Sequence, residues 1–186
     1  MIVSKKRLIG WILFVFCILL IPYVSMIFTD QINWKLSDFL VMGIALAGIG
    51  IFYELIVRQT KEVTYRTAFM IGLLGAFLLF WVNSAVGIIG SENQDANLLY
   101  SAVFVVGLVG ALASRFEAKG MSITLMVASI VQMTVPMMAL IIWPPSRISW
   151  TPSVIGVFLL SGFFALLFYL SSMLFRRAAN NEMNLN

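Results

Sequence analysis

The chain has 186 residues, of which 61% are hydrophobic and only 11% are charged, and its formal net charge is +4. Soluble domains carry about 25% charged residues, so this composition excludes an ordinary soluble domain and predicts an integral membrane protein. A helix needs about 20 apolar residues to cross a bilayer, and the length therefore allows roughly six spans joined by short loops.

Six apolar segments have the length of a membrane-spanning helix, and polar or basic connections separate them. Two consecutive prolines, Pro144 and Pro145, end the fifth segment, because proline removes a backbone donor and forces an extended chain. We expect an all-α, polytopic membrane protein that forms a single transmembrane domain over residues 1–186. The predicted spans cover residues 8–28, 39–57, 67–86, 97–114, 121–143 and 154–175.

The basic residues predict the orientation of these spans. Ten of the 12 lysines and arginines flank the spans on one side, and only Lys35 and Arg147 lie on the other. Basic residues concentrate in cytoplasmic loops, so both termini are expected in the cytoplasm. The same distribution argues against a nucleic-acid partner, which would require a basic face. The expected partners are the lipid bilayer and either another membrane protein or a second copy of the chain.

Small residues predict which spans pack most closely, because helices in lipid associate through close approach and occasional polar contacts. Spans two to five each carry small or polar residues at helical spacing on one face, whereas spans one and six lack such a stripe. We therefore expect a close-packed core of spans two to five, with spans one and six more peripheral. The stripes are Gly43, Ala47, Gly50 and Glu54; Gly72, Ala76, Leu79, Asn83, Gly87 and Gly90; Val103, Gly107, Gly110 and Ser114; and Leu125, Ala128, Gln132, Pro136 and Ala139.

The third connection has the most distinctive sequence of the chain. It carries Ala-Val-Gly-Ile-Ile-Gly-Ser-Glu at 85–92 and Ala-Asn-Leu at 96–98. Together with Ser-Asp-Phe at 37–39, Tyr-Glu-Leu at 53–55, Trp-Val-Asn at 81–83, Arg-Phe at 115–116 and Gly-Met at 120–121, it resembles an uncharacterised family of small bacterial inner-membrane proteins. Gln94-Asp95 departs from the Asn-Pro of that family. The resemblance implies a bacterial cytoplasmic membrane and no known activity.

Several kinds of chemistry are excluded by missing residue types. The chain has no histidine and a single cysteine, Cys17. A His- or Cys-ligated metal or haem site therefore has no ligand set, and Ser-His-Asp or Cys-His catalysis has no base. No phosphate-binding glycine-rich loop followed by Lys-Ser or Lys-Thr occurs. We expect no metal, no cofactor and no enzymatic activity.

The candidate functional residues are the polar side chains in and between the spans. Glu92 and Asp95 form an acidic connection, which is either a solvated loop or a pair of carboxylates that attracts cations. Asn97 opens the fourth span, and Asn83 and Gln132 lie on faces predicted to be buried. These amides either join helices by hydrogen bonds or line a polar path.

Glu54 is the one acidic residue inside a predicted span. An acid within the membrane is by default a functional candidate, but one near a helix end also forms structural ion pairs. Its candidate partners are Arg58, four residues further on, and Arg66 and Arg115 at the same depth on neighbouring spans.

Two functions of different classes fit this pattern. The first is a structural or accessory membrane protein that docks with other membrane proteins or self-associates. The second is a small channel or transporter with an acidic outer mouth at Glu92 and Asp95, amides along the path, and Glu54 near its inner end. An intramembrane enzyme comes third, since it would depend on these few carboxylates alone.

Overall fold

The computed structural model describes residues 5–28, 34–55 and 60–183. These residues form helices and connections, with no strand among them. Six helical segments are long and apolar enough to cross a membrane. This finding confirms the predicted all-helical, six-span architecture and identifies a multi-pass membrane protein. The chain divides into two compact units, residues 1–59 and 60–186, which are described separately below. Orientation and the single-domain organisation stay predictions.

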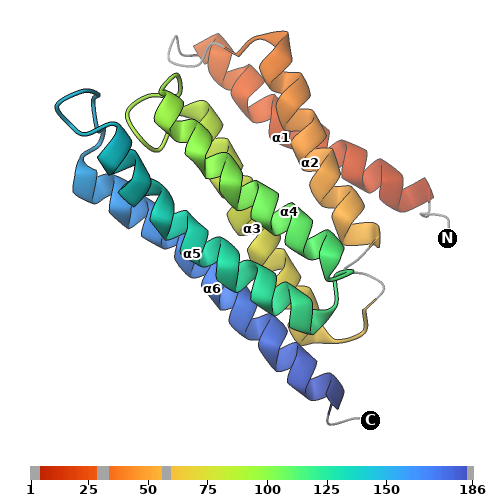
Figure 1. The fold of residues 1–186 in the computed structure, drawn as a ribbon. Helices are drawn as coiled ribbons and strands as arrows, with labels where there is room; N and C mark the ends of the chain where they lie inside the picture. The colour runs from red at the N-terminus through yellow and green to blue at the C-terminus, as the bar shows by residue number, and fades with distance from the viewer. Residues whose placement is uncertain (1–4, 29–33, 56–59, 184–186) are drawn as a thin grey trace. The chain divides into compact units, whose positions relative to one another are not determined.

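The first unit consists of helix α1 (Lys5–Phe28) and helix α2 (Leu36–Leu55), which pack side by side (Figure 1). Asp38 lies in the first turn of α2, and its carboxylate accepts a hydrogen bond from the Lys35 backbone N–H at 2.7 Å. Gly50 of α2 is buried against Trp11 of α1, whose ring would lie 3.0 Å from an added Cβ. The absence of a side chain at Gly50 therefore lets the two helices approach.

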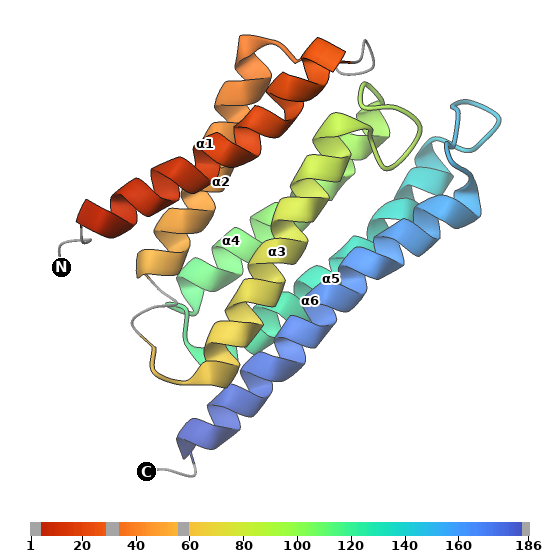
Figure 2. The same cartoon turned by 180° about the vertical axis from the view of Figure 1, so that it is seen from behind.

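The second unit contains the other spans, and α6 packs against both α3 and α5 (Figure 1; Figure 2). Helix α4 packs on α5 and is preceded by a short 3-10 helix, η2. The thirteen residues of α4 cover about 20 Å at the α-helical rise. The six residues of η2 add about 12 Å, so the two together match a hydrocarbon core of about 30 Å. The elements are α3 (Val63–Ala85), η2 (Asp95–Tyr100), α4 (Ser101–Ala113), α5 (Ala118–Ile142) and α6 (Val154–Met183).

The prediction that span six is peripheral is wrong. Helix α6 packs along both α3 and α5, and it carries a continuous buried face. The residues of this face follow one another at alternating spacings of four and three, the pattern of a helix packed against neighbours. They are Val157, Ser161, Phe164, Phe168, Ser171, Phe175 and Ala178. Three of these seven residues are phenylalanines, so a search for small residues alone overlooks this face. The place of span two in a common core concerns both units and stays a prediction.

Glycines of α3 explain the close packing of α3 on α6. A Cβ added at Gly72 would lie 2.9 Å from the Ser171 hydroxyl, and one added at Gly75 would lie 3.3 Å from the Phe168 ring. The Ser171 hydroxyl also donates to the Ala68 carbonyl at 2.6 Å. The predicted stripe of α3 thus marks a helix contact, although the contact is with span six.

Candidate functional site

The connection between α3 and η2 folds back on itself at two glycines. Gly87 has φ +74° and Gly90 has φ +75°, the left-handed region that glycine enters without steric cost. An added Cβ at Gly87 would lie 2.5 Å from the Ser91 carbonyl. Ile88 and Ile89, between the two glycines, are completely buried. The connection is therefore a compact loop with an apolar interior.

Asn97 holds this loop together from inside. Its side-chain oxygen accepts hydrogen bonds from the backbone N–H groups of Ile88 at 3.0 Å and Ile89 at 2.9 Å. Its amide nitrogen donates to the carbonyls of Ile89 at 3.1 Å and Ser91 at 2.7 Å. Asn97 is itself buried. Buried backbone groups need hydrogen-bond partners, and one side chain here supplies four such bonds.

Asn83 and Asn97, both selected from the sequence, lie together. The Asn83 amide nitrogen donates to the Asn97 backbone carbonyl at 3.3 Å. The Asn83 side-chain oxygen is buried and has no hydrogen-bond partner among the described residues. Asn83 therefore ties the end of α3 to the start of η2 and keeps one unused acceptor.

The two acids of the loop lie on its outer rim. Glu92 and Asp95 are both exposed, as are Ser91 and Asn93 beside them. The Glu92 carboxylate accepts a hydrogen bond from the Asn93 side chain at 3.2 Å. Among the described residues, no group of three or more His, Cys, Asp or Glu could hold a metal ion. The rim is thus a small acidic surface on a rigid base.

The loop is also joined to the connection between α5 and α6, a contact that the sequence did not indicate. The Gly90 N–H donates to the Thr151 carbonyl at 3.3 Å. A Cβ added at Gly90 would lie 2.7 Å from the Ser149 carbonyl oxygen. Within the second connection, the Trp150 indole N–H donates to the Trp143 carbonyl at 2.9 Å. Two connections at the same end of the unit therefore support one another.

Gln132 is fully buried in α5 and has no hydrogen-bond partner on either amide atom among the described residues. The Ser129 hydroxyl donates to the Ala165 carbonyl at 2.8 Å, which fixes the register of α5 against the antiparallel α6. Gln132 lies three residues beyond Ser129, and Ser161 lies four residues before Ala165. At 1.5 Å per residue, both are about 5 Å from that bond in the same direction. Gln132 is therefore at the depth of Ser161.

Ser161 and Tyr100 form a buried pair that sequence reasoning missed. Their hydroxyls lie 2.7 Å apart, and both side chains are completely buried. Tyr100 ends η2 and Ser161 belongs to α6, so this bond joins the short helix that follows the loop to α6. The signal in the sequence was faint: one serine within an apolar run.

Glu54 lies in the last turn of α2 and is partly exposed. Its candidate partner Arg58 lies outside the described residues, and Arg66 and Arg115 belong to the other unit. Both of these arginines are exposed. The predicted ion pair of Glu54 therefore stays a prediction.

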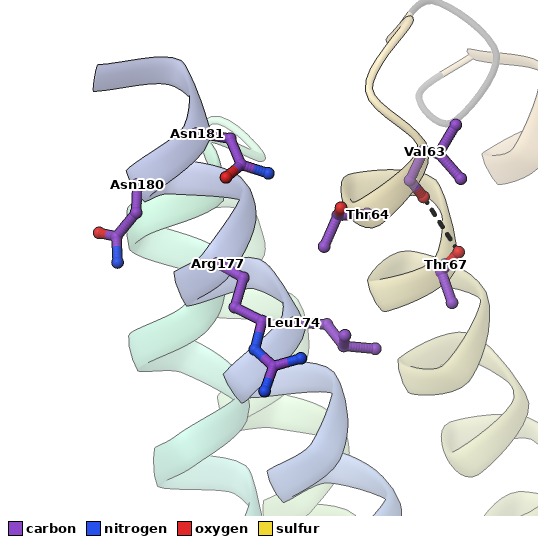
Figure 3. A pocket seen from close by; sticks show the side chains of 7 residues that line it. All are labelled: Val63, Thr64, Thr67, Leu174, Arg177, Asn180 and Asn181. Atoms are coloured by element: carbon purple, nitrogen blue, oxygen red, sulfur yellow. Dashed lines mark hydrogen bonds between the residues drawn. The ribbon is translucent and has the colours of Figure 1, made fainter. Parts of the chain in front are cut away.

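The opposite end of the second unit has a pocket of about 440 Å³ between α3 and α6 (Figure 3). Glu62 caps α3 there, accepting hydrogen bonds from the Tyr65 backbone N–H and, at 3.1 Å, from the Asn181 side chain. Slight burial raises the pKa of the Glu62 carboxyl, but hydrogen bonds from Asn181, Thr64 and Tyr65 outweigh it and set this pKa below its ordinary value. The pocket is lined by Val63, Thr64, Thr67, Leu174, Arg177, Asn180 and Asn181.

Comparison of the chain with protein-family models, with curated proteins and with solved structures finds no match. The family resemblance of the third connection therefore stays a prediction, and the function is argued from the residues themselves.

Proposed function

We propose that this chain is a structural or accessory protein of the bacterial cytoplasmic membrane, with both termini in the cytoplasm. It docks with another membrane protein, or with a second copy of itself, through the acidic rim formed by Glu92 and Asp95 on the loop between α3 and η2. In the proposed orientation this loop faces outside, and we call it the outer loop. The basic residues on one side of the spans support this orientation.

One observation carries the proposal: hydroxyls inside the second unit are used to join helices. Ser129, Ser171 and Ser172 donate to backbone carbonyls of a neighbouring helix at 2.8, 2.6 and 2.7 Å. The Tyr100–Ser161 bond adds a contact of the same kind. Polar groups committed to helix contacts do not line a hydrated path, and this use is typical of a static bundle.

The rim of the outer loop supports docking at this end. Functional contacts concentrate on loops that a rigid scaffold holds in place. Here Asn97 and the two left-handed glycines fix the base, while Glu92 and Asp95 remain exposed. An exposed acidic surface suits a partner that offers basic or hydrogen-bond-donating groups.

Purification from native membranes in mild detergent tests the docking proposal. The wild-type chain should elute as a discrete complex, and Glu92→Gln combined with Asp95→Asn should release it while leaving the fold unchanged. Glu117→Gln removes an exposed acid at the other end of the second unit and should behave as wild type. A wild-type chain that elutes as a monomer, or a complex that survives the double substitution, would contradict docking through this rim.

Labelling with an impermeant thiol reagent tests the orientation. In a Cys17→Ala background, Ser91→Cys and Ser149→Cys should react from outside the cell. Thr60→Cys and Ala118→Cys should react only after the membrane is opened. The reverse pattern would contradict the basic-residue argument.

Gln132 favours the second candidate, a small channel or transporter. A buried amide without hydrogen bonds costs about 1–3 kcal/mol for each unmade bond, and polar groups inside a membrane protein mark ion or substrate pathways. The unused oxygen of Asn83 points to the same use.

The substitution Gln132→Met separates the two candidates, because methionine fills a similar volume without polar atoms. A docking scaffold should become more stable by about 1–3 kcal/mol and should keep its complex. A channel should lose an ion flux that the wild type shows in proteoliposomes, while staying folded.

A further inference from the structure

A groove of about 1040 Å³ lies on the α5 side of α6, at the end of the second unit where its basic residues gather. Helices α5 and α6 run side by side there (Figure 1; Figure 2). The groove has the size of small-molecule sites, which measure about 300–1,000 Å³. We call it the inner groove, and its lining differs sharply between mouth and depth.

The mouth of the inner groove is basic. The Ser172 hydroxyl donates to the Ser122 carbonyl at 2.7 Å and fixes the helix register. Lys119 lies three residues before Ser122, and Arg176 lies four residues after Ser172, so both are about 5 Å from this bond toward the same end. Both side chains are exposed and line the groove. Two cations therefore face the same opening at the same depth.

Arg177 and Glu117 complete the charge of the mouth. Both line the inner groove, and Arg177 also lines the pocket beside α3 (Figure 3). The three cations outnumber the single carboxylate of Glu117, so the mouth attracts anions. Guanidinium groups suit phosphate in particular, since they can donate two parallel hydrogen bonds to it.

The depth of the inner groove is apolar. Ile123, Val127 and Met173 line it and remain exposed on the helix surface. Ile123 and Val127 lie four and eight residues from Lys119, which places them about 6 and 12 Å further into the span. This wall is long enough to contact the upper part of a hydrocarbon chain.

We propose that the inner groove binds an anionic phospholipid of the surrounding bilayer. The phosphate lies between Lys119 and Arg176, and one acyl chain follows Ile123, Val127 and Met173. Basic pockets between helices near a membrane surface recognise anionic headgroups in this way. A free phosphate would use only the mouth, and a zwitterionic lipid would gain less from it, because its own cation opposes the positive charges.

Native mass spectrometry and thermal unfolding of the full chain test the proposal, with phosphatidylglycerol and phosphatidylcholine as probes. Phosphatidylglycerol should bind more tightly and raise the melting temperature more. Lys119→Gln with Arg176→Gln should weaken this binding about 30-fold, since each cation near an anionic lipid contributes about 1 kcal/mol and 1.4 kcal/mol is tenfold in affinity.

Three controls make the result specific. Lys61→Gln with Arg115→Gln removes the same charge from residues that do not line the groove and should leave binding unchanged. Arg176→Lys keeps the charge and should retain most of the affinity. This variant still tests the role of the charge if the variant with both Lys119 and Arg176 changed fails to fold. Val127→Ser should weaken the binding of phosphatidylglycerol but leave any binding of glycerol 3-phosphate unchanged, because only the lipid has an acyl chain that contacts the apolar wall of the groove.

Three outcomes would overturn the proposal. The first is equal affinity for the two lipids, and the second is an equal loss of binding in the control with Lys61 and Arg115 changed. The third is competition by glycerol 3-phosphate at the concentration of the lipid, which would show a site for phosphate alone.

Discussion

The clearest test of the structure is the removal of the Asn97 side chain by Asn97→Ala. The truncation leaves the buried N–H groups of Ile88 and Ile89 without their acceptor, and two carbonyls lose their donor. Each buried group left unsatisfied costs about 1–3 kcal/mol. The two N–H groups alone therefore predict a loss of about 2–6 kcal/mol, which is large against a typical stability of about 5–15 kcal/mol.

Unfolding of the purified chain in mixed detergent micelles measures this loss. Asn93→Ala is the matched control, because Asn93 is exposed in the same loop and its replacement should change stability by no more than about 0.5 kcal/mol. Hydrogen exchange at Ile88 and Ile89 gives a second, local measurement. Both amides should exchange much faster in Asn97→Ala even if the loop opens without unfolding the helices.

A double-substitution cycle with Gly87→Ala tests whether the loop acts as a unit. An added Cβ at Gly87 would lie 2.5 Å from the Ser91 carbonyl and 2.8 Å from the Asn97 amide nitrogen, so this substitution alone should open the same loop. Once one substitution has opened the loop, the second removes few remaining contacts. The loss of unfolding free energy in the double variant should therefore be smaller than the sum of the two single losses. The reasoning is refuted if Asn97→Ala is as stable as Asn93→Ala with unchanged exchange at Ile88 and Ile89.

Two further predictions concern packing and pH. Gly110→Ala should destabilise the protein by about 1–3 kcal/mol, because the new Cβ would lie 2.5 Å from the side chain of Thr124. Gly107→Ala is the control, since its new Cβ meets no atom within 4 Å and the change should be neutral or slightly stabilising. Equal melting temperatures of the two variants would contradict this prediction. The lowered pKa of Glu62 means that its carboxylate stabilises the folded state above the ordinary value of 4.5 and that this contribution disappears as the pH falls through the lower, folded-state pKa. Glu62→Gln should therefore reduce the loss of stability on acidification, by under about 1 kcal/mol at this exposed position, and an unchanged pH profile of unfolding would count against the cap.

The spans and the buried face of α5 could be predicted from the sequence, because both depend on local properties. Length and hydropathy set the spans, and helical periodicity with small residues sets the face that can approach a neighbour. All five predicted residues of that face are buried. They are Leu125, Ala128, Gln132, Pro136 and Ala139.

The two glycines of α4 show where such local patterns stop being sufficient. Gly107 and Gly110 belong to the same predicted stripe, yet only Gly110 lies against another helix, at Thr124. The difference is set by the position of α5, which the sequence of α4 does not contain. The exact role of Asn97 was hidden for the same reason. Its four hydrogen bonds exist only after Gly87 and Gly90 have turned the chain back.

The packing of the second unit does not explain the unsatisfied amide of Gln132. Serines on the same helices find carbonyl partners, so this bundle can satisfy buried polar groups where stability requires it. Gln132 lies on a face of apolar and small residues, and both of its amide atoms lack a partner among the described residues. A pure scaffold would gain stability from an apolar residue of the same volume at this position. The sign of the stability change in Gln132→Met, measured beside flux and complex formation, is therefore the observation on which the two candidate functions differ most.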